Sequence, residues 1–350
     1  MFRVNIKKLN WKTIVYGILG VGVLYVVVIG VLIYGFGLQD KWLVKKTAQY
    51  VPYPAAIVGG TSFVTVNELQ TDLAAVRQFY ESQDFSDMGL KVDFNSSDGQ
   101  KRLQIKQKQI LDKLIENKII ERLAIARGVK VTDDMVSQNV NKEAAQYNSA
   151  ADVEVRLHKL YGWNIDDFKE RIVKPDMYRQ ALEDNLKSTD PSIVKAREKI
   201  VQAQSALKGN ADFADVVKKF SEGESAKNGG ELGWLSADQM LPEIAVTAFL
   251  MDKGQTSDII QTSLGFHIIQ VEDKKTENGV DKVRLRQIFV RTESFPDWLA
   301  AQEKNISVLI PFYGLTWNRQ NDEVDFTHKD MRDFENNLSK NSPDNVSVLF

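Results

Sequence analysis

Apolar residues run almost without interruption from Thr13 to Leu38, and this run contains no charged residue. About 20 helical residues, each rising 1.5 Å, cross the hydrocarbon core of a bilayer, so the run predicts a transmembrane helix over 13–38. A cleavable signal peptide has a shorter apolar region, of about 7–15 residues, and a small-residue cleavage site, which the segment after Tyr34 lacks. The alternative is a helix buried in a soluble protein.

The residues that flank the run predict how it is oriented. Tyr34, Phe36 and Trp42 suit a membrane–water interface, and basic residues before the run favour a cytoplasmic start, although lysines follow the run as well. We expect residues 1–12 to be a cytoplasmic basic N-terminus. The helix then crosses the lipid bilayer of the plasma membrane once, and the bulk of the chain is extracytoplasmic. Residues 39–54 are expected to be a juxtamembrane linker.

The next region has the pattern of a helical bundle. Residues 56–65 predict strand–turn–strand, leading into a helix at 66–69, and 84–100 is a polar loop. Apolar positions spaced by three and four predict an amphipathic helix over 100–127, with Gly128 as C-cap and Thr132 as N-cap of the next helix. Further helices are expected near 151–160, 164–172 and 175–187, the last opened by Pro175. The pattern alone fits any structural bundle.

The C-terminal half mixes helices and strands. A helix is expected over 194–208, and β patterns cover 266–272 and 283–291, on either side of the turn-rich segment 274–281. Beyond residue 293 the pattern predicts a short helix from Phe295 to Leu299, strands at 306–310 and 324–326, and a helix over 330–338. Residues 339–350 are expected to be frayed.

These elements predict the α+β class, with a small antiparallel sheet in the second half of the chain. The expected order is the transmembrane helix, a mainly helical region at 55–190, an α+β domain at 191–293 and a C-terminal segment at 294–350. No motif marks the last segment, and packing back onto the helical region is one arrangement that its pattern allows.

Composition and charge exclude several classes of function. The net charge of −2 argues against a nucleic-acid partner, which normally requires a basic face. The chain has no cysteine, so disulfides, thiolate metal sites and Cys nucleophiles are excluded. There are three histidines, and we expect two of them, His158 and His328, at the surface. We therefore predict neither a metal site nor a cofactor.

Ordered fragments between 55 and 190 resemble the N-terminal chaperone region of the SurA, PrsA and PpiD foldases. They are Ile57-Val58-Gly59-Gly60, Val64-Thr65, Ile110-Leu111-Asp112-Lys113-Leu114-Ile115, Ala126-Arg127-Gly128-Val129-Lys130-Val131-Thr132-Asp133, Tyr161-Gly162 and Val173-Lys174-Pro175. The resemblance implies a helical region that binds unfolded chains.

A second set of motifs resembles a parvulin (PpiC-type rotamase) domain over 191–273. It comprises Phe213-Ala214 to Phe220-Ser221, Asn228-Gly229-Gly230-Glu231-Leu232-Gly233-Trp234, Gln239-Met240-Leu241-Pro242, Ala248-Phe249, Lys253-Gly254-Gln255 and Leu264-Gly265-Phe266-His267-Ile268-Ile269. The resemblance implies a peptidyl-prolyl cis–trans isomerase.

One element of the parvulin pattern stands out of order. Family members begin with a strand reading roughly V-R-x-R-H-I-L-V, whereas residues 186–191 of this chain are expected to be a linker. A similar sequence, Val283-Arg284-Leu285-Arg286-Gln287-Ile288-Phe289-Val290, follows the last family strand. We hypothesise a circular permutation in which 266–272 and 283–291 pair antiparallel. The rival interpretation is that 283–291 begins a second, degenerate parvulin copy.

The resemblance also implies site residues. His267, Thr262 and Gln287 would be catalytic, Gln287 standing where the family has a first-strand histidine. The remaining matched positions would form the apolar pocket for proline: Leu232, Met240, Ile244 and Phe249. Each has an alternative as part of the scaffold or core. Ile244 replaces an aromatic residue, and Gly223 stands where the family usually has Cys or Asp.

Three functions follow from these patterns. The first is a membrane-tethered foldase that isomerises X-Pro bonds in unfolded, exported polypeptides. The second is a holdase chaperone whose parvulin domain has lost turnover. The third is a membrane-anchored structural or adhesive protein. Nothing in the pattern indicates an oligomeric state.

Overall fold

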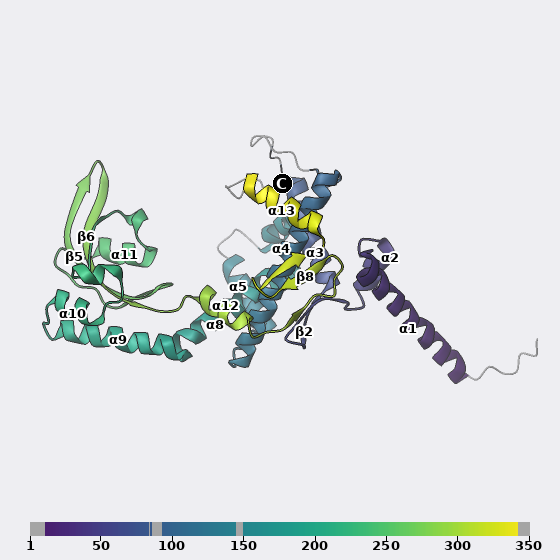
Figure 1. Cartoon of the computed structure of the whole chain (residues 1–350), viewed down its shortest axis with the longest axis horizontal. Helices are drawn as coiled ribbons and strands as arrows, with labels where there is room; N and C mark the ends of the chain where they lie inside the picture. The colour runs from purple at the N-terminus through teal and green to yellow at the C-terminus, as the bar shows by residue number, and fades with distance from the viewer. Residues whose placement is uncertain (1–10, 84, 86–92, 145–149, 342–350) are drawn as a thin grey trace, which may run out of the picture. The chain divides into compact units, whose positions relative to one another are not determined.

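The computed structural model describes residues 11–83, 85, 93–144 and 150–341. The chain divides into two compact units, Met1–Arg179 with Glu303–Phe350, and Gln180–Gln302 (Figure 1). Both units combine helices with antiparallel strands, which confirms the α+β class.

The first unit begins with the expected apolar helix, α1 (Trp11–Phe36), and the stretch Val15–Phe36 is long and apolar enough to cross a membrane. The chain then reverses at Gly37, whose φ of +63° suits a residue without a Cβ. A short helix, α2 (Trp42–Ala48), follows within the segment expected to be a linker.

A three-stranded sheet comes next, in the order β2-β1-β7. It consists of β1 (Pro54–Val58), β2 (Ser62–Thr65) and β7 (Val308–Leu309). The predicted strand–turn–strand is confirmed, and the C-terminal segment supplies the third strand. A capping box between Thr65 and Glu68 starts helix α3 (Val66–Ser82).

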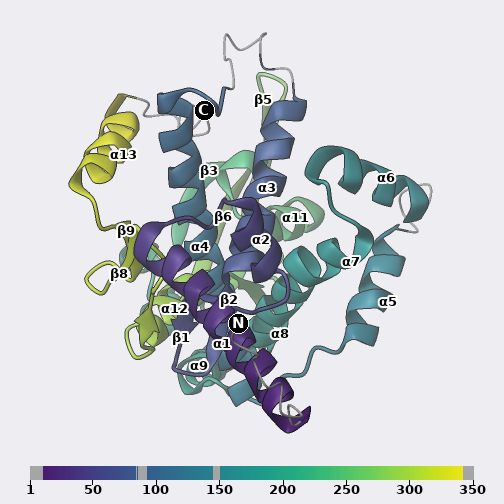
Figure 2. The same cartoon turned by 90° about the vertical axis from the view of Figure 1, so that its right-hand side faces the viewer.

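The helical region contains α4 (Ser97–Ala126), α5 (Asp133–Ala144) and α6 (Ala150–Tyr161), and α3 packs against α4 and α6 (Figure 2). Gly128 lies just after α4 with a φ of +80°, and the Thr132 hydroxyl accepts a hydrogen bond from the Met135 N–H, as predicted. The polar loop expected over 84–100 is wrong at its end, because Ser96 caps α4 and makes 97–100 its first turn. Residues 84 and 86–92 of that loop lie outside the described residues.

The helices expected at 164–172 and 175–187 form one continuous run. Helix α7 (Ile165–Phe168) passes through a π-turn (Lys169–Val173) into α8 (Lys174–Thr189). Proline lacks an N–H and disturbs a helix interior. The π-turn changes the hydrogen-bond register immediately before Pro175, so the helix need not break there. The linker expected over 186–191 is also wrong, since α8 continues to Thr189 and Asp190 caps α9 (Pro191–Lys208).

The C-terminal segment begins with α12 (Phe295–Glu303). From Glu303 on it belongs to the first unit and packs on α4, and it contains the hairpin of β8 (Leu315–Asn318) and β9 (Glu323–Phe326), and α13 (Lys329–Asn341). The Val324 N–H donates to the Asp112 carboxylate at 2.8 Å, and Lys108 pairs with Glu335 at 2.8 Å. The pattern missed β8. Fraying is wrong for 339–341, which are helical, and 342–350 lie outside the described residues.

The second unit is built on a four-stranded antiparallel sheet in the order β3-β6-β5-β4. Its strands are β3 (Glu231–Leu235), β4 (Ile260–Thr262), β5 (Gly265–Glu277) and β6 (Val280–Arg291). Its shorter helices are α10 (Phe213–Phe220), α11 (Pro242–Leu250) and the 3₁₀ turns Glu224–Asn228 and Ala237–Gln239.

The pairing predicted between 266–272 and 283–291 is confirmed, with Ile268 opposite Ile288. The segment 274–281 is not turn-rich, because both strands continue through it (Figure 1). The turn is reduced to Asn278 and Gly279, with φ of 54° and 77°. Two successive positive φ angles are what a tight hairpin needs to match the twist of its strands.

Side chains alternate between the two faces of this sheet. One face, with Phe266, Ile268, Ile288 and Val290, packs against α9 and α10. The opposite face, with Ile269, Val271, Val283 and Leu285, is covered by α11.

Candidate functional site

A row of polar side chains crosses the sheet face that α11 covers. His267 on β5 lies on the same face of the sheet as Ile269 and Val271. Gln287 on β6 lies on the same face as Val283 and Leu285. Thr262 lies at the end of β4. The Thr262 hydroxyl is 3.0 Å from His267 Nε2, and His267 Nδ1 is 3.3 Å from Gln287 Oε1. The structure thus brings together three residues from three neighbouring strands.

The hydrogen bonds place a proton on Nδ1 of His267. The Oε1 atom of Gln287 can only accept, so the Nδ1–H of His267 donates to it. The Thr262 hydroxyl accepts from the Leu264 N–H at 3.1 Å, and its own proton has two acceptors within reach, His267 Nε2 at 3.0 Å and the Gly265 carbonyl at 3.4 Å. Donation to Nε2, the shorter of the two contacts, corresponds to a neutral imidazole with its proton on Nδ1.

Burial supports the neutral form. His267 is 4% exposed and Thr262 is 8% exposed. Loss of solvent lowers the pKa of His267 below its usual 6.5, although the Gln287 hydrogen bond and the Glu243 carboxylate act in the opposite direction. The His267 ring also stacks on Phe289, with centroids 4.6 Å apart and planes inclined by 23°.

The pattern missed two groups that extend this row. The Gln287 amide donates to the Ser225 hydroxyl at 3.5 Å, so the row reaches the loop after α10. Ser221, in the same loop, accepts from the Phe289 N–H at 3.0 Å and fastens the loop to β6. The Phe220-Ser221 pair was the sequence signal for this loop, but its attachment depends on β6.

Gly223 lies between these two serines. A Cβ built there would be 3.5 Å from Cδ1 of Phe289 and 3.7 Å from the Ser225 hydroxyl, which are ordinary contact distances. A Cys or Asp side chain would therefore project toward the row, and Ser225 is the hydroxyl nearest to that position.

The four expected pocket residues lie together on the same face. Ile244 is buried in the apolar cluster under α11, and the other three are partly buried and pack against that cluster: Leu232, Met240 and Phe249. The apolar group and the polar row thus occupy one side of the sheet.

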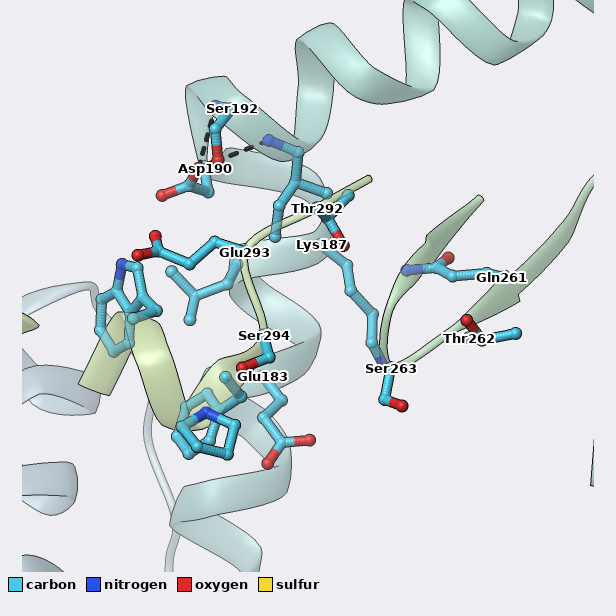
Figure 3. Close-up of a pocket in the computed structure, with 15 residues that line it drawn as sticks. Glu183, Lys187, Asp190, Ser192, Gln261, Thr262, Ser263, Thr292, Glu293 and Ser294 are labelled. Atoms are coloured by element: carbon cyan, nitrogen blue, oxygen red, sulfur yellow. Dashed lines mark hydrogen bonds between the residues drawn. The ribbon is translucent and has the colours of Figure 1, made fainter. Parts of the chain in front are cut away.

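A cavity of about 250 Å³ lies beside Thr262 and its neighbours Gln261 and Ser263 (Figure 3). Figure 3 shows β4 on one wall and the segment Thr292–Ser294 beside the start of α9 on the other. Its apolar lining is Leu186, Ile193, Phe295, Pro296 and Trp298. Of the polar row, Thr262 lines this cavity and His267 and Gln287 do not.

The other histidines lie outside this site, since His158 and His328 are both exposed. Within residues 11–83, 85, 93–144 and 150–341, no group of three His, Cys, Asp or Glu side chains could hold a metal ion.

Two protein families match separate parts of the chain. The PPIC-type PPIASE domain family matches residues 181–273, and the SurA-like N-terminal domain family matches residues 5–155. The chain thus combines a SurA-like N-terminal domain with a PpiC-type rotamase domain, and the resemblance read from its motifs is confirmed. The rotamase match ends before β6, so the strand that carries Gln287 lies outside it.

Its curated relatives are SurA chaperones and PrsA foldases. Chaperone SurA of Hydrogenovibrio crunogenus is 24% identical over 49% of this chain and 48% of its own length. Foldase protein PrsA of Geobacillus kaustophilus is 24% identical over 51% of this chain and 68% of its own length. Chaperone SurA of Methylobacillus flagellatus is 35% identical, but over 31% of this chain and 26% of its own. The chain thus spans about half the length of the first of these relatives.

Among solved structures, the peptidylprolyl isomerase PrsA of Bacillus anthracis is 21% identical, with 56% of this chain and 86% of that one covered. The TM-score is 0.20, so this similarity supports no conclusion about the arrangement of the whole chain.

Proposed function

We propose that this chain is a membrane-tethered, extracytoplasmic foldase that accelerates cis–trans isomerisation of X-Pro bonds in unfolded, exported polypeptides and also binds them as a chaperone. The SurA and PrsA relatives and the two family matches support the foldase class. The observation that carries the activity is the row from Thr262 through His267 to Gln287 beside an apolar group.

The reaction requires no nucleophile and no cofactor from this chain. The barrier is the partial double bond of the peptide, about 18–20 kcal/mol, and uncatalysed X-Pro isomerisation takes tens to hundreds of seconds. A twisted amide loses resonance and is less polar around nitrogen than a planar one. An apolar surface that holds the proline ring and excludes water therefore favours the twisted state over the ground state. Leu232, Met240, Ile244 and Phe249 are the residues that would provide this surface.

The polar row would orient the substrate carbonyl. His267 and Thr262 are almost fully buried, which fits positioning residues better than groups that touch substrate. Gln287 and Ser225 are only partly buried, so their amide and hydroxyl are the groups that would contact the peptide. In this scheme the neutral His267 fixes the orientation of the Gln287 amide.

We interpret the rotamase domain as circularly permuted, with β6 replacing the strand that opens the domain in other members. Three observations support this interpretation: β6 lies beside β5 at the centre of the sheet, the rotamase match ends at residue 273, and α8 occupies the segment where the family has a strand. Residues 191–293 would then be the complete catalytic domain.

The membrane part of the proposal is that α1 crosses the plasma membrane once, with the N-terminus in the cytoplasm and the bulk of the chain outside. The length and composition of α1 support a span, and the basic residues before it favour this orientation.

A pure holdase is the second candidate function. Gly223 leaves the loop without the usual Cys or Asp side chain, Ile244 offers no aromatic face, and His267 is buried. These features would allow the domain to bind a client without turning it over.

A protease-coupled assay on a short X-Pro peptide separates the two candidates. We expect the full chain in detergent to accelerate isomerisation, and His267→Ala and Met240→Ala each to reduce kcat/KM about ten-fold. His158→Ala and Met135→Ala are matched controls at exposed positions and should leave it unchanged. No acceleration above background, together with suppressed aggregation of an unfolded client, would leave only the holdase.

A further inference from the structure

The apolar helix α1 is packed onto its own globular unit rather than joined to it by a free linker. After the reversal at Gly37, α2 runs back beside the second half of α1. Ile29 and Ile33 on α1 are buried, as are Val44 and Ala48 on α2. The two helices contact each other, and these apolar side chains are buried within the first unit.

Three tyrosine hydrogen bonds fix the level of this contact along α1. Tyr25 bonds the Thr47 hydroxyl at 2.7 Å, and Tyr53 donates to the backbone carbonyl of Val26 at 2.7 Å. Tyr34 donates to the carbonyl of Pro54 at 3.1 Å. Val26 lies ten residues before the end of α1, which is about 15 Å along the helix axis. Residues 47–54 therefore lie beside the part of α1 between Tyr25 and Tyr34 and not beyond its end.

The position along α1 at which residues 47–54 contact it restricts where the bilayer can lie. If the hydrocarbon core extended to Phe36, the exposed Lys45 and Lys46 on α2 would be inside it, at a cost of about 2.5–3.5 kcal/mol for each charge near its centre. A span from Trp11 to Val31 is about 31 Å long, which matches a core of about 30 Å. The outer end of the span would then be displaced by five residues toward the N-terminus. The start of α2 would lie at the outer interface, and Lys45 and Lys46 would lie within about one turn of it, from where their long side chains can extend to the headgroups.

The exposed face of this segment has the chemistry of such an interface. Trp42, Leu43 and Tyr50 are 71%, 48% and 80% exposed. The Lys46 ammonium lies 5.3 Å from the centroid of the Trp42 ring. We define the interface collar as Lys41, Trp42, Leu43, Lys45, Lys46 and Tyr50. Asp40 is the one acidic residue in the sequence between 39 and 54, so the segment carries a net positive charge.

We propose that the interface collar binds the headgroups of anionic phospholipids and seats the first unit on the bilayer surface. Aromatic rings favour the boundary between headgroups and acyl chains, and lysines near an anionic surface add to the attraction. This proposal rests on the proposed membrane span, and it adds that the span runs from about Trp11 to Val31 and that the first unit does not swing on a linker.

The chain has no cysteine, so a single introduced cysteine gives a unique label in the full-length protein. We would reconstitute four variants in vesicles containing phosphatidylglycerol and label each with an environment-sensitive fluorophore. Leu43→Cys and Tyr50→Cys report on the interface collar. Val23→Cys, 64% exposed on α1, reports on the span, and Val155→Cys, 68% exposed on α6, reports on a position away from the membrane.

We expect quenchers at shallow depth in the lipid to quench the Leu43 and Tyr50 labels, and deep quenchers to quench the Val23 label. An aqueous quencher should act on the Val155 label. If the Leu43 and Tyr50 labels behave like Val155 while Val23 is in lipid, the interface collar is wrong and the span stands. If Val23 also behaves like Val155, the membrane span itself is wrong.

Two substitutions test the requirement for anionic lipid. In the Tyr50→Cys background, Lys45→Gln and Lys46→Gln should each make the label more accessible to the aqueous quencher. We expect the quenching constant to rise about five-fold for each lysine removed. The same shift should follow when the vesicles are made of phosphatidylcholine alone. An equal depth of the label in both vesicles, unchanged by either substitution, would contradict headgroup binding.

Discussion

Gln287 accepts a hydrogen bond from His267 across neighbouring strands, at 3.3 Å, and its amide donates a hydrogen bond to Ser225. The contact exists because β6 follows β5 through a tight hairpin and places Gln287 opposite Ile269, two residues before Phe289, the partner of His267, and so on the same face of the sheet. A strand that comes late in the sequence therefore completes the polar row in the middle of the sheet.

The first prediction concerns Gln287 itself. Gln287→Ala should reduce kcat/KM for an X-Pro peptide about ten-fold, because it removes one hydrogen bond to His267 and leaves a buried donor unpaired. Gln287→His should retain activity, since an imidazole nitrogen can accept the same bond. Gln270→Ala, on the other face of β5, is the control. Equal turnover in all three variants would show that the row plays no part in the reaction.

The second prediction concerns Gly223. Gly223→Asp and Gly223→Cys should raise kcat/KM several-fold, because the new side chain fits beside Phe289 and Ser225. The backbone φ of −74° suits any residue, so stability should rise by about 0.4–1 kcal/mol. Gly223→Ala is the matched control, with the same stabilisation and no gain in turnover. If alanine gave the same gain as Asp, backbone rigidity and not the polar group would be responsible.

The third prediction concerns the pH dependence of His267. Burial lowers its folded-state pKa below 6.5, so the unfolded state binds the proton first as the pH falls. The contribution of this residue to stability is therefore present above pH 6.5 and is lost as the pH falls through the lower, folded-state pKa. Nitrogen NMR of the imidazole should show the Nδ1–H neutral tautomer at pH 6.5. A doubly protonated ring at that pH would be inconsistent with the proposed row.

The fourth prediction concerns Glu303, where the C-terminal segment approaches α4. Burial, followed by repulsion from Glu116, Asp322 and Asp112, raises the pKa of Glu303 to about 7, from 4.5. A raised folded-state pKa gives a contribution that is complete below pH 4.5 and lost as the pH rises through about 7. Glu303→Gln should therefore stabilise the first unit at pH 8 and change it little at pH 5.

Hydrogen exchange of β7 and β9 at the two pH values measures this effect on the first unit alone. Glu154→Gln, at an exposed position on α6, is the control and should alter exchange at neither pH. Faster exchange in Glu303→Gln at pH 8 would mean that the carboxylate stabilises the segment as an anion.

Much of the fold could be predicted because local patterns agree with the tertiary arrangement. The three-and-four spacing within 100–127 is one face of α4, and the apolar alternation of 283–291 needed a partner strand, which 266–272 supplied. The length of the β5–β6 hairpin could not be predicted from the spacing of apolar residues. Its distal half is polar, and it carries ion pairs such as Lys282–Glu277 instead of apolar alternation. The pair Asn278-Gly279 is typical of a two-residue hairpin turn. The charged residues on both sides of it made the whole segment look like a loop.

The rest depended on tertiary contacts. Helix α2 is short and forms against α1, so its sequence resembled a linker. The continuous helix through Pro175 depends on a π-turn that no spacing indicates. Ser225 joins the polar row only because Ser221 fastens its loop to β6.

A double-mutant cycle tests the central claim most directly. It measures kcat/KM for an X-Pro peptide in the full chain, His267→Ala, Gln287→Ala and the double variant. Because both residues act through one hydrogen bond, the double variant should lose little more than either single variant, with a coupling of at least about 0.5 kcal/mol. Fully additive losses, or a full chain with no activity above background, would contradict a working site formed by the β5–β6 pairing.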